Sequence, residues 1–198
     1  MTSLIRLAAA HDAGQVLAIY APIVRNTIVS FETEPPSTDE MQGRIVEILA
    51  HFPWLVCERD GEILGYAYAS KHRTRRAYQW SVDVSAYVHE QARRFGVGRA
   101  LYTSLLKLLT VQGFYNAYAG IALPNPASVG LHEAVGFQPV GVYHAVGYKL
   151  GAWHDVGWWS LALQAHAVPP TPPVALSAIQ NTAEWHTALA TGLPLLRL

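Results

Sequence analysis

The chain has 198 residues, the length of one domain or of one domain with an extension. Its 14 basic residues balance its 14 acidic ones, so no net charge favours nucleic acid or an anionic membrane as a partner. Only 14% of residues are charged, against roughly 25% in an average soluble protein. The chain also has six Trp and ten Tyr. Low charge and many aromatic residues together suggest that some apolar surface is covered in an oligomer.

The amino-terminal segment has neither the basic region nor the long apolar run of a secretory signal, and no stretch approaches ~18 uninterrupted apolar residues. We therefore expect a cytoplasmic protein without a membrane span. The single cysteine, Cys57, excludes an intrachain disulfide. It lies in the apolar run 54–57, which favours a buried structural thiol over a nucleophile. No two histidines have metal-ligand spacing such as His-x-x-x-His, so we expect no metal.

Six elements are expected in the first half: a strand at 3–7, helices at 11–20 and 37–50, and strands at 53–58, 62–70 and 80–88. The first helix is indicated by Val16, Ile19 and Tyr20 at helical spacing. Asp60-Gly61 is typical of a hairpin turn between two strands. Alternation of apolar and polar residues predicts the strand at 80–88.

Five further elements follow: helices at 99–112 and 126–136, and strands at 115–123, 138–150 and 156–163. The helix at 99–112 has an apolar leucine face and ends at Gly113, a residue favoured at helix carboxyl ends. The order β-α-α-β-β-β-α-β-α-β-β indicates one mixed α/β domain over residues 1–163.

The composition changes in residues 164–198. The run Pro169-Pro170-Thr171-Pro172-Pro173 predicts a stiff, extended linker, and a weak helix is expected at 178–190 around Trp185. A disordered or dimer-packing extension is the expectation, and its role stays open.

The segment between the predicted strand at 80–88 and the helix at 99–112 is the most informative. Gly96 and Gly98 let a ligand approach the backbone closely, and amides at the start of a helix favour an anion. Arg93, Arg94 and Arg99 add positive charge. A pyrophosphate site and a simple strand-to-helix turn both fit these residues.

Two other phosphate-binding loops are excluded. A dinucleotide-binding loop would carry a third glycine at position 101, where Leu101 stands, and a P-loop would carry a lysine after the glycines.

Arg93-x-x-Gly96-x-Gly98 resembles the (Gln/Arg)-x-x-Gly-x-(Gly/Ala) signature of GNAT acetyltransferases, and residues 123–137 resemble its companion motif. The resemblance implies the GNAT fold, a mixed and mostly antiparallel sheet flanked by helices. It also implies that loop amides hold the pyrophosphate of acetyl-CoA, while Asn125 and its helix line the other side. The cofactor-binding residues expected on this basis are Tyr87, Val88, Arg93, Arg94, Phe95, Gly96, Val97, Gly98, Arg99, Asn125 and Ser128.

Over roughly residues 4–163 the chain further resembles phosphinothricin acetyltransferases, most specifically in the segment 147–159. Such enzymes are typically homodimers that acetylate the α-amino group of phosphinothricin or of related compounds such as methionine sulfoximine. The resemblance implies acetyl-CoA as co-substrate and a small amino-acid-like acceptor. Acetylation of protein N-termini or other amines, and a non-catalytic acyl-CoA-binding module, remain alternatives. A third alternative, a nucleotide-dependent oxidoreductase, is disfavoured because the glycine of a dinucleotide-binding loop is missing at position 101.

Acetyl transfer to an amine requires a deprotonated ammonium and a stabilised thiolate. Asp83 stands where the similar enzymes carry a glutamate regarded as the general base; it is one methylene shorter, so a water relay is an alternative to direct contact. His132 stands where this subfamily places a histidine, and we expect it to serve as acid or thiolate stabiliser. The competing interpretations are a structural ion pair for Asp83 and a helix-surface position for His132.

The run 71–76 places four basic residues in six positions. Arginine can bind a carboxylate or phosphinate through two hydrogen bonds, although a solvated surface fits equally well. By resemblance, the expected acceptor-binding residues are Arg73, Arg75 and Tyr78, together with Phe31 and Thr33 of a substrate-covering segment. Trp158 and Trp159 are expected in the core or in a dimer interface.

Overall fold

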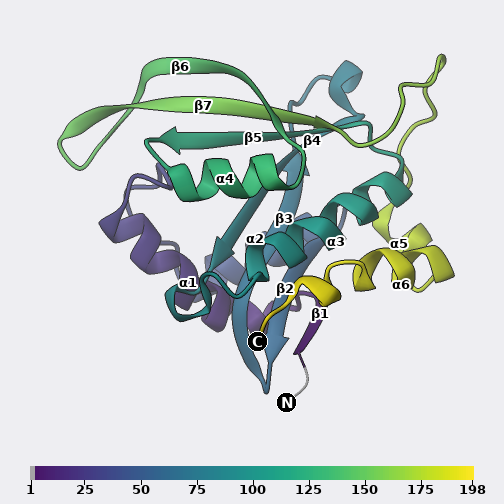
Figure 1. Cartoon of the computed structure of the whole chain (residues 1–198), viewed down its shortest axis with the longest axis horizontal. Helices are drawn as coiled ribbons and strands as arrows, with labels where there is room; N and C mark the ends of the chain where they lie inside the picture. The colour runs from purple at the N-terminus through teal and green to yellow at the C-terminus, as the bar shows by residue number, and fades with distance from the viewer. Residues whose placement is uncertain (1–2) are drawn as a thin grey trace.

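The computed structural model describes residues 3–198 and is built on one seven-stranded sheet (Figure 1). The strands are β1 (Ser3–Leu7), β2 (Trp54–Arg59), β3 (Glu62–Lys71), β4 (Ser81–Val88), β5 (Asn116–Leu123), β6 (Gln138–Lys149) and β7 (Ala152–Ala162). Their spatial order is β1-β2-β3-β4-β5-β7-β6, and every neighbouring pair is antiparallel except β4 and β5. The predicted mixed, mostly antiparallel sheet is therefore confirmed.

The helices cover both faces of this sheet (Figure 1). They are α1 (Ala13–Asn26), α2 (Thr38–Leu49), α3 (Val97–Gln112), α4 (Pro126–Ala134), α5 (Leu176–Ile179) and α6 (Ala183–Ala190). Short 3-10 turns lie at η1 (Ala10–Asp12), η2 (Arg76–Tyr78), η3 (Glu90–Ala92) and η4 (Leu193–Leu195). Buried residues form one cluster around α3 and another around α1 and α2, so each sheet face has its own core.

Two elements extend beyond the predicted limits. α1 continues past Pro22 to Asn26, because the fully buried Val24 packs the last turn into the core and offsets the hydrogen bond that proline removes. β7 begins at Ala152 because Leu150 and Gly151, with φ angles of 51° and 82°, form a two-residue turn that returns the chain directly onto β6.

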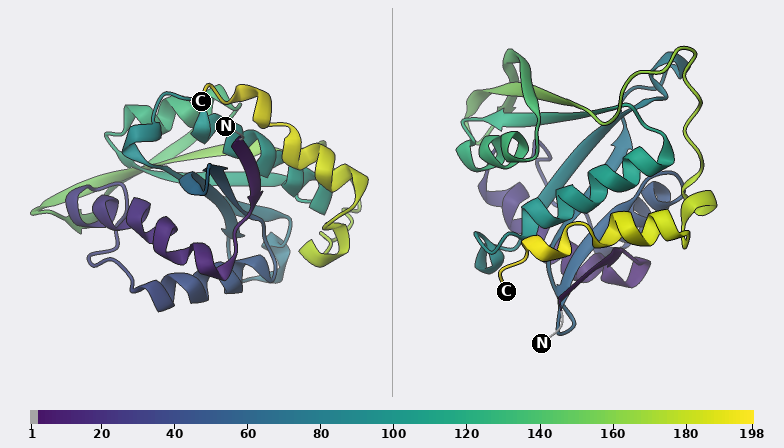
Figure 2. Two further views of the ribbon diagram at one scale, coloured as in Figure 1. Left: turned by 90° about the horizontal axis from the view of Figure 1, so that it is seen from below. Right: turned by 45° about the vertical axis from the view of Figure 1, so that its right-hand side comes forward.

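The carboxyl-terminal segment packs on its own domain. α6 runs alongside α3 (Figure 2), and Leu176 and Trp185 are buried within the main core. Gly192 donates its N–H to Ser104 Oγ at 3.1 Å, and a Cβ there would collide with the carbonyl of Ala100. The disordered alternative is therefore wrong for the residues described here.

Among residues 3–198, no helix has both the length and the apolar character needed to cross a membrane.

The sheet opens between its two parallel strands. β4 pairs with β5 only where 81–83 face 116–118. Beyond Asp83 no residue of β4 pairs with β5, whereas β5 pairs with β7 along its whole length, so the sheet opens between β4 and β5.

Candidate active site

A cavity of about 840 Å³ lies in the gap between the diverging strands. It is bordered by the end of β4, the loop that follows, the start of α3 and the helix α4. All the cofactor-binding residues expected from the sequence line it except Phe95: Tyr87, Val88, Arg93, Arg94, Gly96, Val97, Gly98, Arg99, Asn125 and Ser128. The cavity thus has the length and lining to hold an extended anionic ligand.

The local geometry of the loop suits a phosphate group. Gly96 has a φ of 82°, a left-handed conformation that glycine adopts without strain. It lets the chain turn into α3, whose first amides have no helical partner and favour an anion. A Cβ on Gly98 would lie 3.1 Å from Leu131 Cδ2 and 3.4 Å from Val88 Cγ2, so glycine also permits the close approach of α3 to α4 and β4.

Phe95 is placed differently from the prediction. Its side chain is 44% exposed and does not line the cavity. Its carbonyl oxygen instead accepts a hydrogen bond from the backbone N–H of Arg197 at 3.0 Å. Phe95 therefore anchors the carboxyl-terminal segment rather than facing the cleft.

The carboxyl-terminal segment completes the wall of the cavity, which sequence reasoning missed. Pro194, Leu195 and Arg197 line it together with the loop. The Leu195 carbonyl lies so close to Gly96 that any Cβ there would collide with it. Arg197 adds a further cation to a wall that already carries three.

His132, at the carboxyl end of α4, lines the same cavity and is only 5% exposed. Its Nδ1 lies 2.7 Å from the Ser128 carbonyl, which can only accept, so Nδ1 carries the proton. Its Nε2 therefore accepts from the Tyr102 hydroxyl at 2.9 Å. Burial lowers the pKa of His132, although the bond to Ser128 opposes part of that shift. The ring is neutral, with both nitrogens occupied.

Asp83 is the last residue of β4 that pairs with β5, where it lies opposite Tyr118, and on β3 its partner is Ser70. Its side chain is 29% exposed, and Oδ1 accepts a hydrogen bond from His72 Nδ1 at 2.7 Å. Burial raises the pKa of the Asp83 carboxyl, while His72 and the charge of Arg73 oppose that effect. Asp83 is thus both partly desolvated and paired.

His72 is the residue that sequence reasoning missed in this region. It lies just after β3, and its ring stacks on Tyr118 with centroids 4.4 Å apart and planes at 16°. The ring of Tyr78 meets it edge-on at 6.0 Å. The signal for His72 was present in the basic run 71–76, but only the β3–β4 register shows that it reaches Asp83.

The expected acceptor-binding residues are brought together only in part. Tyr78 contacts His72, and the Arg73 guanidinium lies over the Trp158 ring, 5.8 Å from its centroid. All three predicted residues of this run, Arg73, Arg75 and Tyr78, are exposed. Within residues 3–198 no side-chain hydrogen bond, ion pair or ring contact joins Arg75 to the group around Asp83.

Phe31 and Thr33 project from the segment between α1 and α2. The backbone carbonyl of Ser30 accepts a hydrogen bond from the buried Lys149 Nζ, and the Glu32 carboxylate accepts one from Arg44 at 2.7 Å. Ser30 and Glu32 are therefore the residues of this segment that bind to the rest of the domain. Phe31 and Thr33 remain exposed, and the Phe31 ring lies directly against Gly147 of β6. The segment is held at its inner residues, and neither Phe31 nor Thr33 lines either of the two cavities.

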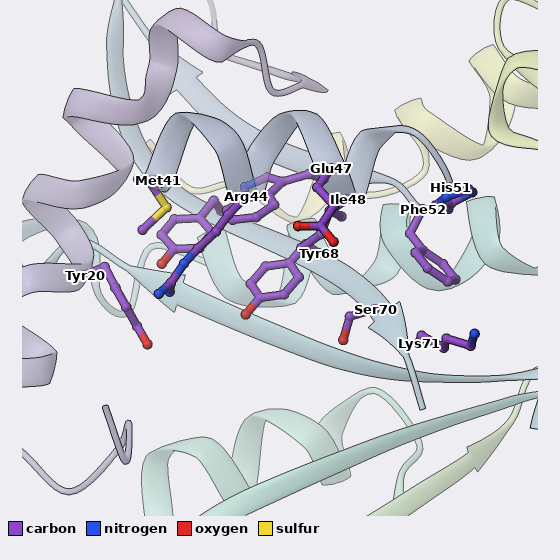
Figure 3. Close-up of a pocket in the computed structure, with 12 residues that line it drawn as sticks. Tyr20, Met41, Arg44, Glu47, Ile48, His51, Phe52, Tyr68, Ser70 and Lys71 are labelled. Atoms are coloured by element: carbon purple, nitrogen blue, oxygen red, sulfur yellow. The ribbon is translucent and has the colours of Figure 1, made fainter. Parts of the chain in front are cut away.

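A second cavity, of about 460 Å³, lies between α2 and β3 (Figure 3). Tyr20, Arg44 and Tyr68 extend into it. Ser70 also lines it, and because Ser70 is the cross-strand partner of Asp83, the carboxylate belongs to the same sheet face. Asp83 therefore lies opposite Ser70 of the smaller, partly aromatic cavity, on the strand whose last residues, from Ala86 to Val88, line the larger one.

Cys57 is fully buried, and burial raises the pKa of its thiol to about 11. It is a structural thiol, as the sequence predicted. Trp159 is 7% exposed and belongs to the main core. No group of three or more potential metal ligands occurs in the part of the chain that the structure describes.

The structure thus combines a parallel strand pair that separates after three residues, a glycine-containing loop at the start of a helix, and a carboxylate where the two strands part. A family model described as an acetyltransferase (GNAT) domain matches residues 5–158. The chain belongs to the GNAT acetyltransferases.

Individual relatives narrow the class. A phosphinothricin N-acetyltransferase of Streptomyces viridochromogenes is 42% identical over 171 residues, which cover 86% of this chain and 93% of that protein. The L-methionine sulfoximine/L-methionine sulfone acetyltransferase of Salmonella typhimurium is 31% identical, covering 83% and 97%. The solved structure of a phosphinothricin acetyltransferase from Sinorhizobium meliloti in complex with AcCoA has a TM-score of 0.81 at 36% identity, covering 88% and 94%. The chain is accordingly an acetyl-CoA-dependent N-acetyltransferase.

Proposed function

We propose that this enzyme transfers the acetyl group of acetyl-CoA to the α-amino group of a small amino acid or analogue, such as phosphinothricin or methionine sulfoximine, by direct attack in a ternary complex. The observation that carries the proposal is the position of Asp83 on β4, opposite Ser70 of the smaller cavity and on the strand whose end lines the larger one. A carboxylate there can serve an amine that enters from one side and a thioester that enters from the other. The names of the relatives supply the class of acceptor.

On the cofactor side, the amides of the loop 94–98 are proposed to bind the pyrophosphate, with charge from Arg93, Arg94 and Arg99. Tyr87 and Val88 would border the chain that carries the thioester. Asn125 Oδ1 caps α4 by accepting from the Ser128 N–H at 3.1 Å, which leaves the Asn125 amide N–H groups for the ligand.

On the acceptor side, Arg75 and Tyr78 are proposed to bind the carboxylate or second polar group of the amino acid, with Arg73 beside them. Their exposure suits this role, because no side chain or backbone group among residues 3–198 forms a hydrogen bond with the Arg75 guanidinium. Phe31 and Thr33 would close over the acceptor from the segment that Lys149 fixes.

His132 is proposed to line the position of the leaving thiolate as a neutral ring, held in place by the Tyr102 hydroxyl and the Ser128 carbonyl. Its depressed pKa and its two occupied nitrogens argue against the imidazolium acid that the sequence interpretation included. Asp83 remains the residue on which deprotonation of the amine depends.

Three further expectations stay predictions: a homodimer, a cytoplasmic location and independence from metal. The dimer is supported by the exposed apolar residues of the β6–β7 hairpin at the edge of the sheet, which include Val140, Val146, Tyr148 and Trp153. Sedimentation of the purified protein with a Trp153→Asp comparison tests whether this face joins two copies.

An acetyl-CoA consumption assay tests the proposal. The panel contains phosphinothricin, methionine sulfoximine, methionine sulfone, the ordinary amino acids and a peptide with a free N-terminus. We expect the highest kcat/KM for a small amino acid with a second anionic or polar group. Faster acetylation of the peptide would favour the protein N-terminus alternative, and binding of acetyl-CoA without any transfer would favour the binding module.

Replacement of Gly98 tests the cofactor side. Gly98→Val places a branched side chain against Leu131 and Val88 and obstructs the amides, and loss of a single bond to a charged group costs roughly 1.5–3 kcal/mol, or about 10- to 150-fold in Kd. Calorimetry with acetyl-CoA measures the effect. Gly43→Val is the control, since Gly43 lies in α2 with open space around it. Unchanged affinity in a folded Gly98→Val enzyme would remove the loop from the proposed site.

A further inference from the structure

We propose that His72 takes the proton from the acceptor amine. Asp83 orients the His72 ring and stabilises the imidazolium that forms. The proposal rests on the acetyl transfer proposed above and adds a catalytic residue to it. It also explains how a site built on aspartate reaches a substrate where similar enzymes use the longer glutamate.

The hydrogen bond between the two residues fixes where the protons are. An ionised carboxylate only accepts, so His72 Nδ1 carries the proton that it shares with Asp83 Oδ1 at 2.7 Å. The lone pair is then on Nε2. Within residues 3–198 no group forms a hydrogen bond with Nε2, and it is not among the fully enclosed unpaired nitrogens, which are those of Trp54 and Trp158. His72 thus presents a free, reachable base.

The ring is held rigidly. One face stacks on Tyr118 and an edge meets Tyr78, and the His72 side chain is only 11% exposed. These contacts and the low exposure leave the ring little freedom to turn. A fixed ring beside a carboxylate is the arrangement by which proteins select one tautomer and stabilise the imidazolium that forms on protonation.

The position matches the acceptor side of the site. His72 directly precedes Arg73 and contacts Tyr78, two residues proposed to bind the acceptor. Tyr118 places it beside the point where β4 and β5 part. The imidazole therefore extends the reach of Asp83 from the sheet toward the acceptor.

The proton balance is complete without another reactant. Nε2 takes one proton from the ammonium group, which becomes an amine, and the imidazolium later releases that proton to water. The amine nitrogen forms a bond to the thioester carbonyl carbon, and the carbon–sulfur bond breaks. The second proton leaves the attacking nitrogen and ends on the CoA sulfur. The products are an amide, CoA thiol and one proton in solution.

The test compares His72→Gln with the wild-type enzyme on the best acceptor of the panel. Glutamine can still donate to Asp83 but cannot accept a proton from an ammonium group. We expect kcat to fall by about 10²- to 10⁴-fold near neutral pH, the usual contribution of a positioned base, with an unchanged calorimetric Kd for acetyl-CoA. The deficit should shrink as the pH rises, because more acceptor is already amine. The charged or titratable groups facing His72 are Asp83, Arg73, Tyr78 and Tyr118, and none is altered.

A second variant and a control complete the design. Added imidazole should restore part of the activity of His72→Ala, an effect that a structural role would not produce. His11→Gln is the matched control, since His11 is 80% exposed and lies 3.6 Å from Asp12, remote from the cleft. A near wild-type rate and pH profile in His72→Gln would overturn the proposal and leave Asp83 as the base, alone or through water. A wild-type enzyme that acetylates no amine would contradict the proposed function instead.

Discussion

Two histidines lie in the two halves of the site and differ in what their ring nitrogens do. His132, in the cofactor cleft, donates to a backbone carbonyl and accepts from Tyr102, so it has no nitrogen left for a substrate. His72, on the acceptor side, is bonded to Asp83 through one nitrogen and unbonded at the other. A histidine that exchanges protons during turnover needs an available nitrogen, and only His72 has one.

The largest effect is expected from removing the charge of Asp83. This charge is needed whether His72 or Asp83 itself takes the proton from the amine. Asp83→Asn keeps the shape and an oxygen acceptor for His72 but cannot stabilise an imidazolium. We expect kcat to fall about 10²- to 10⁴-fold, with the acidic limb of the kcat/KM profile altered, since the wild-type site works in its ionised form. Steady-state kinetics across pH measures this.

Asp83→Glu serves as the companion variant. It should keep substantial activity, because the similar enzymes carry glutamate there. A near wild-type kcat in a folded Asp83→Asn enzyme would show that the amine arrives already deprotonated, and would remove the catalytic role from Asp83 and His72 together.

An intermediate effect is expected on acceptor binding. Arg75→Ala should raise the KM of the amino acid by about 10- to 150-fold, the loss of one charged hydrogen bond of roughly 1.5–3 kcal/mol, and leave that of acetyl-CoA nearly unchanged. Arg76→Ala, its neighbour in η2, is the control. An equal increase for both substrates would place the run 71–76 on the cofactor side and separate His72 from the acceptor.

The smallest catalytic effect is expected for His132→Gln, measured beside His72→Gln. The replacement disturbs the partner of the Tyr102 hydroxyl, and leaving a buried polar group unpaired costs about 1–3 kcal/mol. Urea unfolding should therefore show lower stability while kcat changes far less than in His72→Gln. If His132→Gln is stable but loses as much activity as His72→Gln, the contrast between the two rings fails and His132 is the acid after all.

The sequence predicted the order of strands and helices along the chain and nearly all the residues that line the larger cavity, because these depend on local patterns. Periodicity located the strands, and Gly96 and Gly98 marked a backbone that a ligand can approach. The same local reasoning ended α1 early, since Pro22 disfavours a helix interior and only the burial of Val24 offsets it.

What the sequence could not predict depends on contacts between distant segments. His72 lay inside a run that fitted a solvated surface, and its bond to Asp83 requires the β3–β4 pairing that sets Ser70 opposite Asp83. Leu176 and Trp185 follow a proline-rich linker on short helices, so their periodicity is too brief to show that they cover α3. Phe95 matched a motif position, yet its side chain faces solvent.

The packing of α6 on α3 has a consequence for proteolysis. The linker before it is largely exposed, with Val168 at 95% exposure, while α5 and α6 are fixed to the core by Leu176 and Trp185. A protease should cut in residues 164–168 rather than in the proline-rich stretch 169–173, where proline hinders cleavage. The two fragments should migrate separately on a denaturing gel and together on a native sizing column. Such a nicked enzyme would keep its cleft, because the strap of Pro194, Leu195 and Arg197 is held by packing and not by chain continuity.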